Sequence, residues 1–130
     1  MTFLLDTNAV IKILKGDVIF DRRVGRYRSG EVGVPSVVVY ELYFGVFKGH
    51  RMAGSMEAIG ALRFQTVDFN SEDAKAAAEI RASLAAAGTP IGPYDILIAG
   101  QALARDLTLI THNTREFSRV HGLHIEDWEL

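Results

Sequence analysis

The chain has 130 residues, of which 48% are hydrophobic and 23% are charged. These values are ordinary for a globular domain, so they exclude a disordered or collagen-like chain, and the length suits one domain over residues 1–130. The absence of cysteine excludes disulfide frameworks, thiolate zinc sites and thiol nucleophiles, and the net charge of −2 excludes a uniformly basic protein.

The apolar stretches of the sequence are too short, and too often interrupted by acids, to predict a signal peptide or a membrane-spanning helix. The N-terminus lacks a cationic region and reaches Asp6 before any apolar stretch is long enough for a signal peptide. The most apolar stretch, Val37–Phe47, contains Glu41 and is shorter than the about 20 residues of a membrane-spanning helix. We therefore expect a cytoplasmic protein. Six of the 14 cationic residues lie between residues 12 and 28, which favours a local basic face.

Four short apolar runs alternate with longer segments of helical spacing. The runs are Phe3–Leu5, Val32–Val34, Phe64–Val67 and Leu107–Ile110. Continuous apolar strands are typical of a parallel sheet whose two faces are both covered by helices. The sequence therefore predicts an α/β fold, a three-layer sandwich with a central parallel sheet flanked by helices.

Helix boundaries are marked by capping residues. Ser36 is the expected N-cap of the apolar helix that follows the second strand. The segment 70–73 supplies the cap and acidic first turn of an alanine-rich helix, and Gly88 ends that helix. Pro93 is expected at the first position of the next helix.

Three carboxylates are placed to meet at one edge of this sheet. Asp6 directly follows the first strand, where a helix N-cap is the alternative role. Glu41 interrupts a helix that is apolar nearly all round, so we expect a cationic partner, either Lys or Arg or a metal ion. Asp95 lies in the first turn of a helix, where the helix dipole alone would stabilise it. One shared site explains the three acids better than three separate roles.

A shared carboxylate site predicts a bound divalent cation. Neighbouring carboxylates raise one another's pKa when no cation compensates them. Oxygen ligands without cysteine or paired histidine favour Mg²⁺, with Mn²⁺ as a substitute, over Zn²⁺. Such a site suits the hydrolysis of a phosphodiester bond.

Four motifs run in order along the chain. They are Leu4–Asn8, Ser36–Leu42, Ile91–Ala99 and Leu109–Phe117. Together they resemble the four motifs of PIN-domain ribonucleases of the VapC toxin type. The resemblance implies a Mg²⁺-dependent endoribonuclease, the toxin of a type II toxin–antitoxin system, which a VapB-type antitoxin neutralises.

The resemblance also assigns roles to residues by position. Asp6, Glu41 and Asp95 match the catalytic and metal-binding acids of the family. Thr7 and Asn8 match the polar pair that steadies the first aspartate.

The fourth motif departs from the common pattern of the family. Many PIN domains have an aspartate where this chain has Asn113. We therefore expect three acidic ligands. Thr111, Asn113 or Glu116 is expected to contact these ligands or a metal-bound water instead of the metal itself. His112 is next to this motif, and contact with phosphate or a base is its expected role rather than general base catalysis.

RNA contacts and partners are expected from cations and from the resemblance. Candidate phosphate-binding residues are Lys48, Arg51, Arg115 and Arg119. The resemblance implies tRNA, initiator tRNA in particular, as the substrate. It also implies a homodimer that contacts operator DNA only through the antitoxin complex.

Two other function classes match part of this sequence. A non-catalytic PIN-like protein-binding module would keep the architecture, but the intact acids favour the enzyme. A phosphatase with an Asp-x-Asp nucleophile would need a second aspartate where this chain has Asn8.

Overall fold

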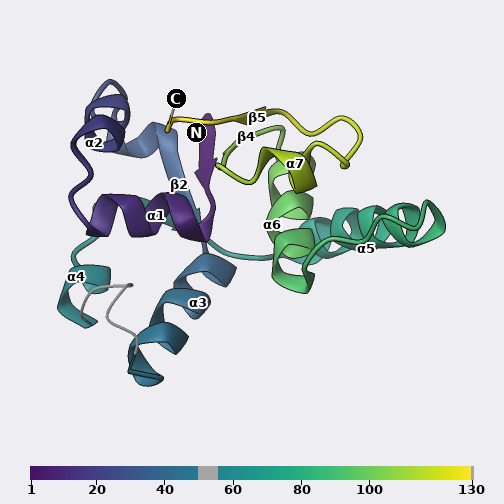
Figure 1. Cartoon of the computed structure of the whole chain (residues 1–130), viewed down its shortest axis with the longest axis horizontal. Coiled ribbons are helices and arrows are strands. Elements are labelled where there is room, and N and C mark those ends of the chain that lie inside the picture. Colours follow the sequence, from purple (N-terminus) through teal and green to yellow (C-terminus); the bar gives the residue numbers. More distant parts are fainter. Residues whose placement is uncertain (50–55, 130) are drawn as a thin grey trace.

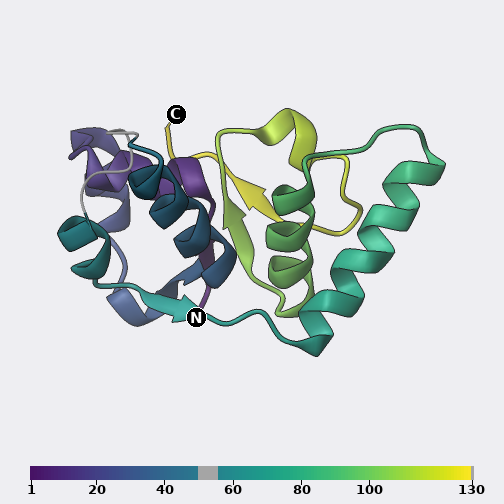
Figure 2. The same cartoon turned by 90° about the horizontal axis from the view of Figure 1, so that it is seen from below.

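The computed structural model describes residues 1–49 and 56–129, which form a five-stranded sheet flanked by helices (Figures 1 and 2). The strand order is β3-β2-β1-β4-β5, and every neighbouring pair is parallel. The predicted three-layer α/β architecture is confirmed. The strands are β1 (Phe3–Leu5), β2 (Val32–Pro35), β3 (Gln65–Val67), β4 (Thr108–Ile110) and β5 (Ile125–Glu126).

Strand β1 lies at the centre of the sheet because it pairs with both β2 and β4. Phe3 is in register with Val32 on one side and with Thr108 on the other. All four predicted strands are present, within a residue of the expected bounds. The sequence missed β5, since two residues make no apolar run that a pattern can detect. This strand continues the sheet beyond β4 and brings the C-terminal segment toward the predicted acidic edge.

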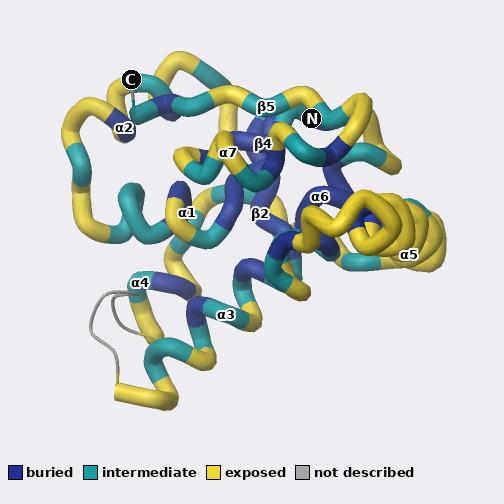
Figure 3. Tube along the Cα trace, turned by 45° about the vertical axis from the view of Figure 1, so that its right-hand side comes forward, coloured by how far each residue is buried: buried dark blue, intermediate teal, exposed yellow. Residues whose placement is uncertain are grey.

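The core consists of the central strands and the helix faces that cover them. Leu4, Leu5, Leu109 and Ile110 are completely buried, as expected for strands covered on both faces. Figure 3 shows the strands as the buried centre, whereas α5 is exposed along most of its length. Trp128 is also completely buried, and its ring stacks on Tyr27 with 5.4 Å between centroids. This aromatic contact anchors the C-terminal segment to the core.

The helices begin close to the predicted positions, with one exception. Ser36 is not an N-cap but the first residue of its helix, because β2 runs through Pro35 directly into it. The prediction for Asn70 is confirmed, since its side chain accepts a hydrogen bond from the Asp73 amide at 3.0 Å. The helices are α1 (Thr7–Leu14), α2 (Val18–Val24), the 3₁₀ turn η1 (Ser29–Glu31), α3 (Ser36–Phe47), α4 (Met56–Gly60), α5 (Ser71–Ala86), α6 (Pro93–Ala104) and α7 (Thr114–Phe117). Within the described ranges, none of them is long and apolar enough to cross a membrane.

Helices α5 and α6 pack closely at one end of the molecule (Figures 1 and 2). A Cβ atom at Gly100 would lie 2.6 Å from the Cβ of Ala77, so only glycine permits this approach. A polar network joins the same helices. The carboxylate of Asp73 on α5 accepts two hydrogen bonds from Arg105, at 3.2 Å from Nε and 3.0 Å from Nη2. We call Asp73, Gln101 and Arg105 the Asp73 network.

Candidate active site

Asp6 lies where β1 ends and α1 begins. Its Oδ1 accepts a hydrogen bond from the amide of Ala9 at 2.9 Å, so it is the N-cap of α1. The side chain is 5% exposed, and burial raises its pKa to about 6. Hydrogen bonds from the Thr111 side chain and the Ala9 amide oppose this rise, whereas the charges of Glu129 and Glu41 add to it. The hydrogen bond to the Ala9 amide therefore does not fully stabilise the charged form of this carboxylate.

Glu41 lies on α3 and is half-buried. Its Oε1 accepts a hydrogen bond from the Thr7 hydroxyl at 2.9 Å, and burial raises the pKa of the carboxyl group. Of the two expected kinds of cationic partner, Lys or Arg is not found in the described residues, where no ion pair involves Glu41. Helix α3 is apolar in sequence, but it is not buried on all sides, because Tyr40 and Phe44 are exposed. The cost of burying Glu41 is therefore smaller than a fully enclosed helix would impose.

Asp95 lies in the first turn of α6, as predicted. Its pKa is raised to about 6, mainly by burial and in part by the charges of Asp6, Glu41 and Glu116. The three acids thus lie near enough to repel one another, although they come from the junction of β1 and α1, from α3 and from α6. We call Asp6, Glu41 and Asp95 the acidic edge.

The residues of the fourth motif lie beside this edge. The buried hydroxyl of Thr111 accepts a hydrogen bond from the Asn113 amide at 2.9 Å and also contacts Asp6. The Asn113 side chain donates to Glu116 Oε2 at 3.0 Å. Because Glu116 raises the pKa of Asp95, its charge faces the acidic edge. Asn113 is therefore placed to orient Glu116.

The polar pair after Asp6 is arranged differently from the prediction. Thr7 donates its hydroxyl to Glu41 instead of steadying Asp6, and Asn8 is exposed. The threonine whose side chain hydrogen-bonds to Asp6 is Thr111. The reason is geometric: β4 pairs with β1, so the residue after β4 lies beside the residue after β1.

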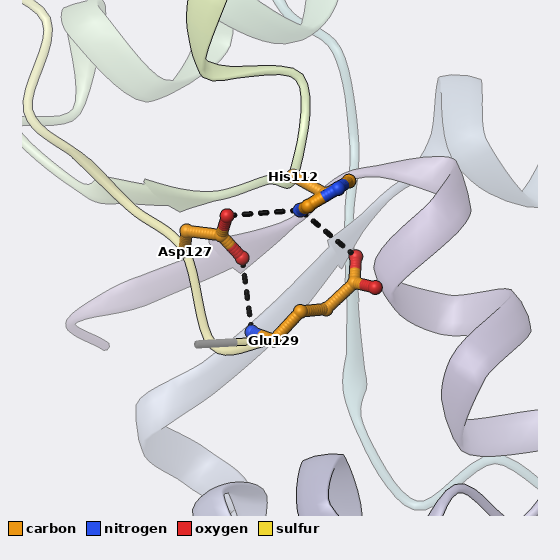
Figure 4. Close-up of side chains that lie close together, drawn as sticks. All are labelled: His112, Asp127 and Glu129. Carbon is orange, nitrogen blue, oxygen red and sulfur yellow. Dashed lines mark hydrogen bonds and ion pairs between the residues drawn. The ribbon is translucent and has the colours of Figure 1, made fainter.

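A second group of side chains, absent from the predictions, surrounds His112 (Figure 4). Its Nδ1 lies 2.9 Å from Asp127 Oδ2 and 3.6 Å from Glu129 Oε2. Lys12 Nζ pairs with Glu129 Oε1 at 3.2 Å. The hydrogen bond to Asp127 is the main cause of a raised His112 pKa, and the charge of Glu129 adds to it. These contacts join the ends of β4 and β5 to α1. No sequence pattern marks the group, since only β4–β5 pairing brings residues 112 and 127–129 together.

The two groups differ in how tightly their ligand atoms are gathered. In the described part of the chain, His112, Asp127 and Glu129 are the one set of three whose ligand atoms all lie within 4.8 Å of one another. The oxygens of the acidic edge are spread more widely. However, ion pairs involving His112 and Lys12 already compensate Asp127 and Glu129. Across residues 1–49 and 56–129, no ion pair compensates the acidic edge.

This charge imbalance fits a divalent cation at the acidic edge. The edge presents carboxylate oxygens, two of its acids have pKa values raised to about 6, and hydroxyl groups orient two of the three side chains. A hard cation would replace repulsion between the carboxylates by attraction. Mg²⁺ in proteins commonly keeps several waters and also binds substrate phosphate oxygens, so a few carboxylates suffice to hold it.

The predicted RNA-binding cations differ in their surroundings. Arg115 is exposed, and Lys48 is exposed with its Nζ over the Phe44 ring, 5.9 Å from the centroid. Arg119 donates to the carbonyl of Pro90 at 3.0 Å, so part of its guanidinium is already engaged. Arg51 lies outside the described residues.

Comparison with known proteins identifies the relatives of this chain. A family model described as the PIN domain matches residues 3–123. The tRNA(fMet)-specific endonuclease VapC of Shigella flexneri is 37% identical over 98% of both chains. A DNA-bound VapBC structure from Salmonella typhimurium has a chain 35% identical to this one, with a TM-score of 0.88 over 98% of both chains. A chain of promoter-bound VapBC2 from Rickettsia felis is 28% identical, with a TM-score of 0.89 over 98% of this chain and 99% of that one.

Proposed function

The chain belongs to the PIN-domain family and to its VapC ribonucleases, and we propose that it is a metal-dependent endoribonuclease that cleaves initiator tRNA and acts as a toxin. The family resemblance predicted from the four motifs is confirmed. The observation that carries the proposal is the acidic edge. It holds three carboxylates with raised pKa values and has no ion pair in the described part of the chain.

In this proposal, Asp6, Glu41 and Asp95 hold the cation, which we propose to be Mg²⁺ with Mn²⁺ as a substitute. When bound, the ion supplies positive charge that polarises the phosphodiester and acidifies a nearby water. Thr111 and the Ala9 amide fix Asp6, and Thr7 fixes Glu41. Glu116, oriented by Asn113, extends the negative surface beside Asp95.

The same carboxylates supply a place for the proton released by the attacking water. We propose that Asp6 or Asp95 accepts this proton on a carboxylate oxygen. In-line attack on phosphorus breaks the bond to the 3′ oxygen. The products are then a 5′-phosphate and a 3′-hydroxyl.

Substrate choice is proposed from the relatives and from surface charge. The similar protein of Shigella flexneri is named a tRNA(fMet)-specific endonuclease. In this chain, the exposed Lys48 and Arg115 are candidates for phosphate contacts. Since the net charge is −2, local cations are needed to hold RNA near a negative edge.

We also propose regulation by a VapB-type antitoxin. The similar solved chains occur in VapBC complexes, two of them bound to DNA. The partner of this chain would bind operator DNA, and the toxin, as a homodimer, would reach it only through that partner. A cationic antitoxin side chain over the acidic edge would compensate the same charges as the metal.

The test is cleavage of purified initiator tRNA, with elongator methionine tRNA as the matched substrate control. We expect discrete cleavage with Mg²⁺ or Mn²⁺ and none with chelator. Asp6→Asn, Glu41→Gln and Asp95→Asn should each lower the rate by about 100-fold or more, because each removes a cation ligand. Glu79→Gln, an exposed acid on α5, should cleave as the wild type does.

Three outcomes would contradict the proposal. Cleavage that persists in chelator would contradict the proposed need for a cation. Equal cleavage of both tRNAs would contradict the proposed specificity for initiator tRNA. No cleavage of either tRNA or of total RNA by folded, antitoxin-free protein would favour a non-catalytic binding module.

A further inference from the structure

Two exposed tyrosines lie beside the acidic edge. Tyr40 directly precedes Glu41 on α3, and Tyr94 directly precedes Asp95 on α6. Their hydroxyl oxygens are 3.2 Å apart and their ring centroids 5.5 Å apart, with 53° between the planes. Residues 54 positions apart in the chain therefore form one aromatic corner at the acidic edge.

This corner differs from the other aromatic contacts of the protein. Tyr27 and Trp128 stack inside the structure, and Trp128 is fully buried. Tyr40 and Tyr94, in contrast, are 53% and 41% exposed. Core packing therefore does not account for the Tyr40–Tyr94 pair, whose side chains remain accessible to solvent.

The hydroxyl groups of the pair add a polar function. One hydroxyl donates to the other, so the accepting hydroxyl keeps its own proton. Among the described residues, these groups have no further hydrogen bond. The pair therefore offers a hydroxyl donor and aromatic rings beside the carboxylates of the acidic edge.

We propose that the Tyr40–Tyr94 pair stacks on an unpaired base next to the phosphodiester that the acidic edge cleaves. This inference rests on the proposed ribonuclease function. RNA is the occupant that the surroundings favour, because the rings directly adjoin the carboxylates proposed to act on phosphate. A base presents a flat π face to a tyrosine ring, and its carbonyl oxygens or ring nitrogens can accept a hydrogen bond from a phenol.

The first test measures RNA binding without cleavage. The probe is a short single-stranded RNA that carries 2-aminopurine, a base whose fluorescence falls on stacking, and the protein carries Asp95→Asn. We expect binding to quench the probe, and Tyr40→Ala and Tyr94→Ala to weaken affinity by about 5- to 100-fold each. Tyr40→Phe and Tyr94→Phe should weaken it less than alanine, since they keep the ring.

Phe47→Ala is the matched control. Phe47 is 76% exposed on the same helix, and its position seven residues from Tyr40 places it about 10 Å along the axis. We expect its affinity for the probe to equal that of the parent protein. An equal loss in Phe47→Ala would overturn the proposal, because general surface apolarity would then explain it.

The second test measures cleavage of initiator tRNA with Mg²⁺ in proteins that retain Asp95. The alanine variants should raise KM more than they lower kcat, because stacking positions RNA and takes no part in bond breaking. Wild type that binds the probe through the tyrosines but cleaves nothing would contradict the ribonuclease proposal while leaving the stacking result standing. Wild type that cleaves, with unchanged KM in both alanine variants, would overturn the stacking proposal alone.

Folding and assembly are checked by thermal melting and size-exclusion chromatography. If an alanine variant unfolds, Tyr40→Leu and Tyr94→Leu are tested instead, since leucine keeps apolar bulk without a π face. They should weaken probe binding as alanine does. Loss of the protein's own oligomer in these variants, with unchanged RNA binding, would show that the rings serve a protein interface and would overturn the proposal.

Discussion

Two regions of this protein bury aspartate in opposite ways. Asp73, in the Asp73 network, is 1% exposed, and Asp6, at the acidic edge, is 5% exposed. The carboxylate of Asp73 accepts two hydrogen bonds from Arg105, one from the Asn70 amide and one from Gln101. Asp6 has a cap contact and a threonine but no cation among the described residues, and its neighbours are Glu41 and Asp95.

The difference shows that burial alone does not identify a functional acid. A buried charge is tolerated when a cation and hydrogen bonds replace its hydration, as around Asp73. Acids that stay uncompensated make the empty fold less stable, so they are expected where a ligand supplies the missing charge. Four measurements test whether the two regions differ in this way.

The largest expected effect is a loss of stability when the Asp73 network is broken. Arg105→Met leaves Asp73 buried with no cation, and we expect the free energy of unfolding to fall by about 3 kcal/mol. Arg81→Met, at an exposed arginine of α5, should change it by less than about 0.5 kcal/mol. Urea denaturation measures both. Equal stability of Arg105→Met and wild type would mean that Asp73 does not depend on this ion pair.

The same Asp→Asn substitution should have opposite signs in the two regions. In chelator, Asp95→Asn removes a repelled charge and should raise the free energy of unfolding by about 1–2 kcal/mol, allowing for partial solvent screening. Asp73→Asn should lower it, because Arg105 loses its bidentate partner. Destabilisation by both substitutions would contradict the view of the acidic edge as uncompensated.

The pH dependence of stability should follow the acidic edge. Asp6 and Asp95 have folded pKa values of about 6 against an ordinary value of 3.8. The folded state therefore binds more protons between these values, and metal-free stability should fall by about 1 kcal/mol or more from pH 5 to pH 7. His112, whose pKa is also raised, contributes in the same direction.

The double variant Asp6→Asn/Asp95→Asn isolates the carboxylates. It keeps the contribution of His112, so the difference between the two pH profiles belongs to the acids. Identical profiles of stability against pH for wild type and double variant would contradict the raised pKa values of Asp6 and Asp95.

The smallest expected effect is stabilisation by metal. At a free Mg²⁺ or Mn²⁺ concentration about fivefold above the Kd, the folded state should gain about 1 kcal/mol, which raises Tm by about 4 °C. Asp95→Asn should lose this shift, whereas Arg81→Met should keep it. A shift of equal size in Asp95→Asn would place the bound ion elsewhere, with the His112 group as the next candidate.

Local sequence determined much of the fold. Continuous apolar runs specify strands buried on both faces, which is why β1, β2 and β4 were predictable. The edge strand β3 is different, because its Gln65 and Thr66 are exposed and only Val67 is buried. The cap at Asn70 and the proline at the first position of α6 both act within one helical turn, so neighbouring residues in the sequence were enough to predict them. The positions of the three acids, at strand ends or in the following helices, also follow from this order.

Only the tertiary structure decided which side chains meet. Thr7 bonds to Glu41, 34 residues away, and Thr111 rather than Thr7 contacts Asp6. The Tyr40–Tyr94 corner and the His112 group likewise join distant segments. Periodicity and capping report on residues within a few positions of one another, whereas these contacts depend on strand order and helix packing. For the same reason, the sequence showed that Asp6 and Asp73 are acidic but not which of them has a cation beside it.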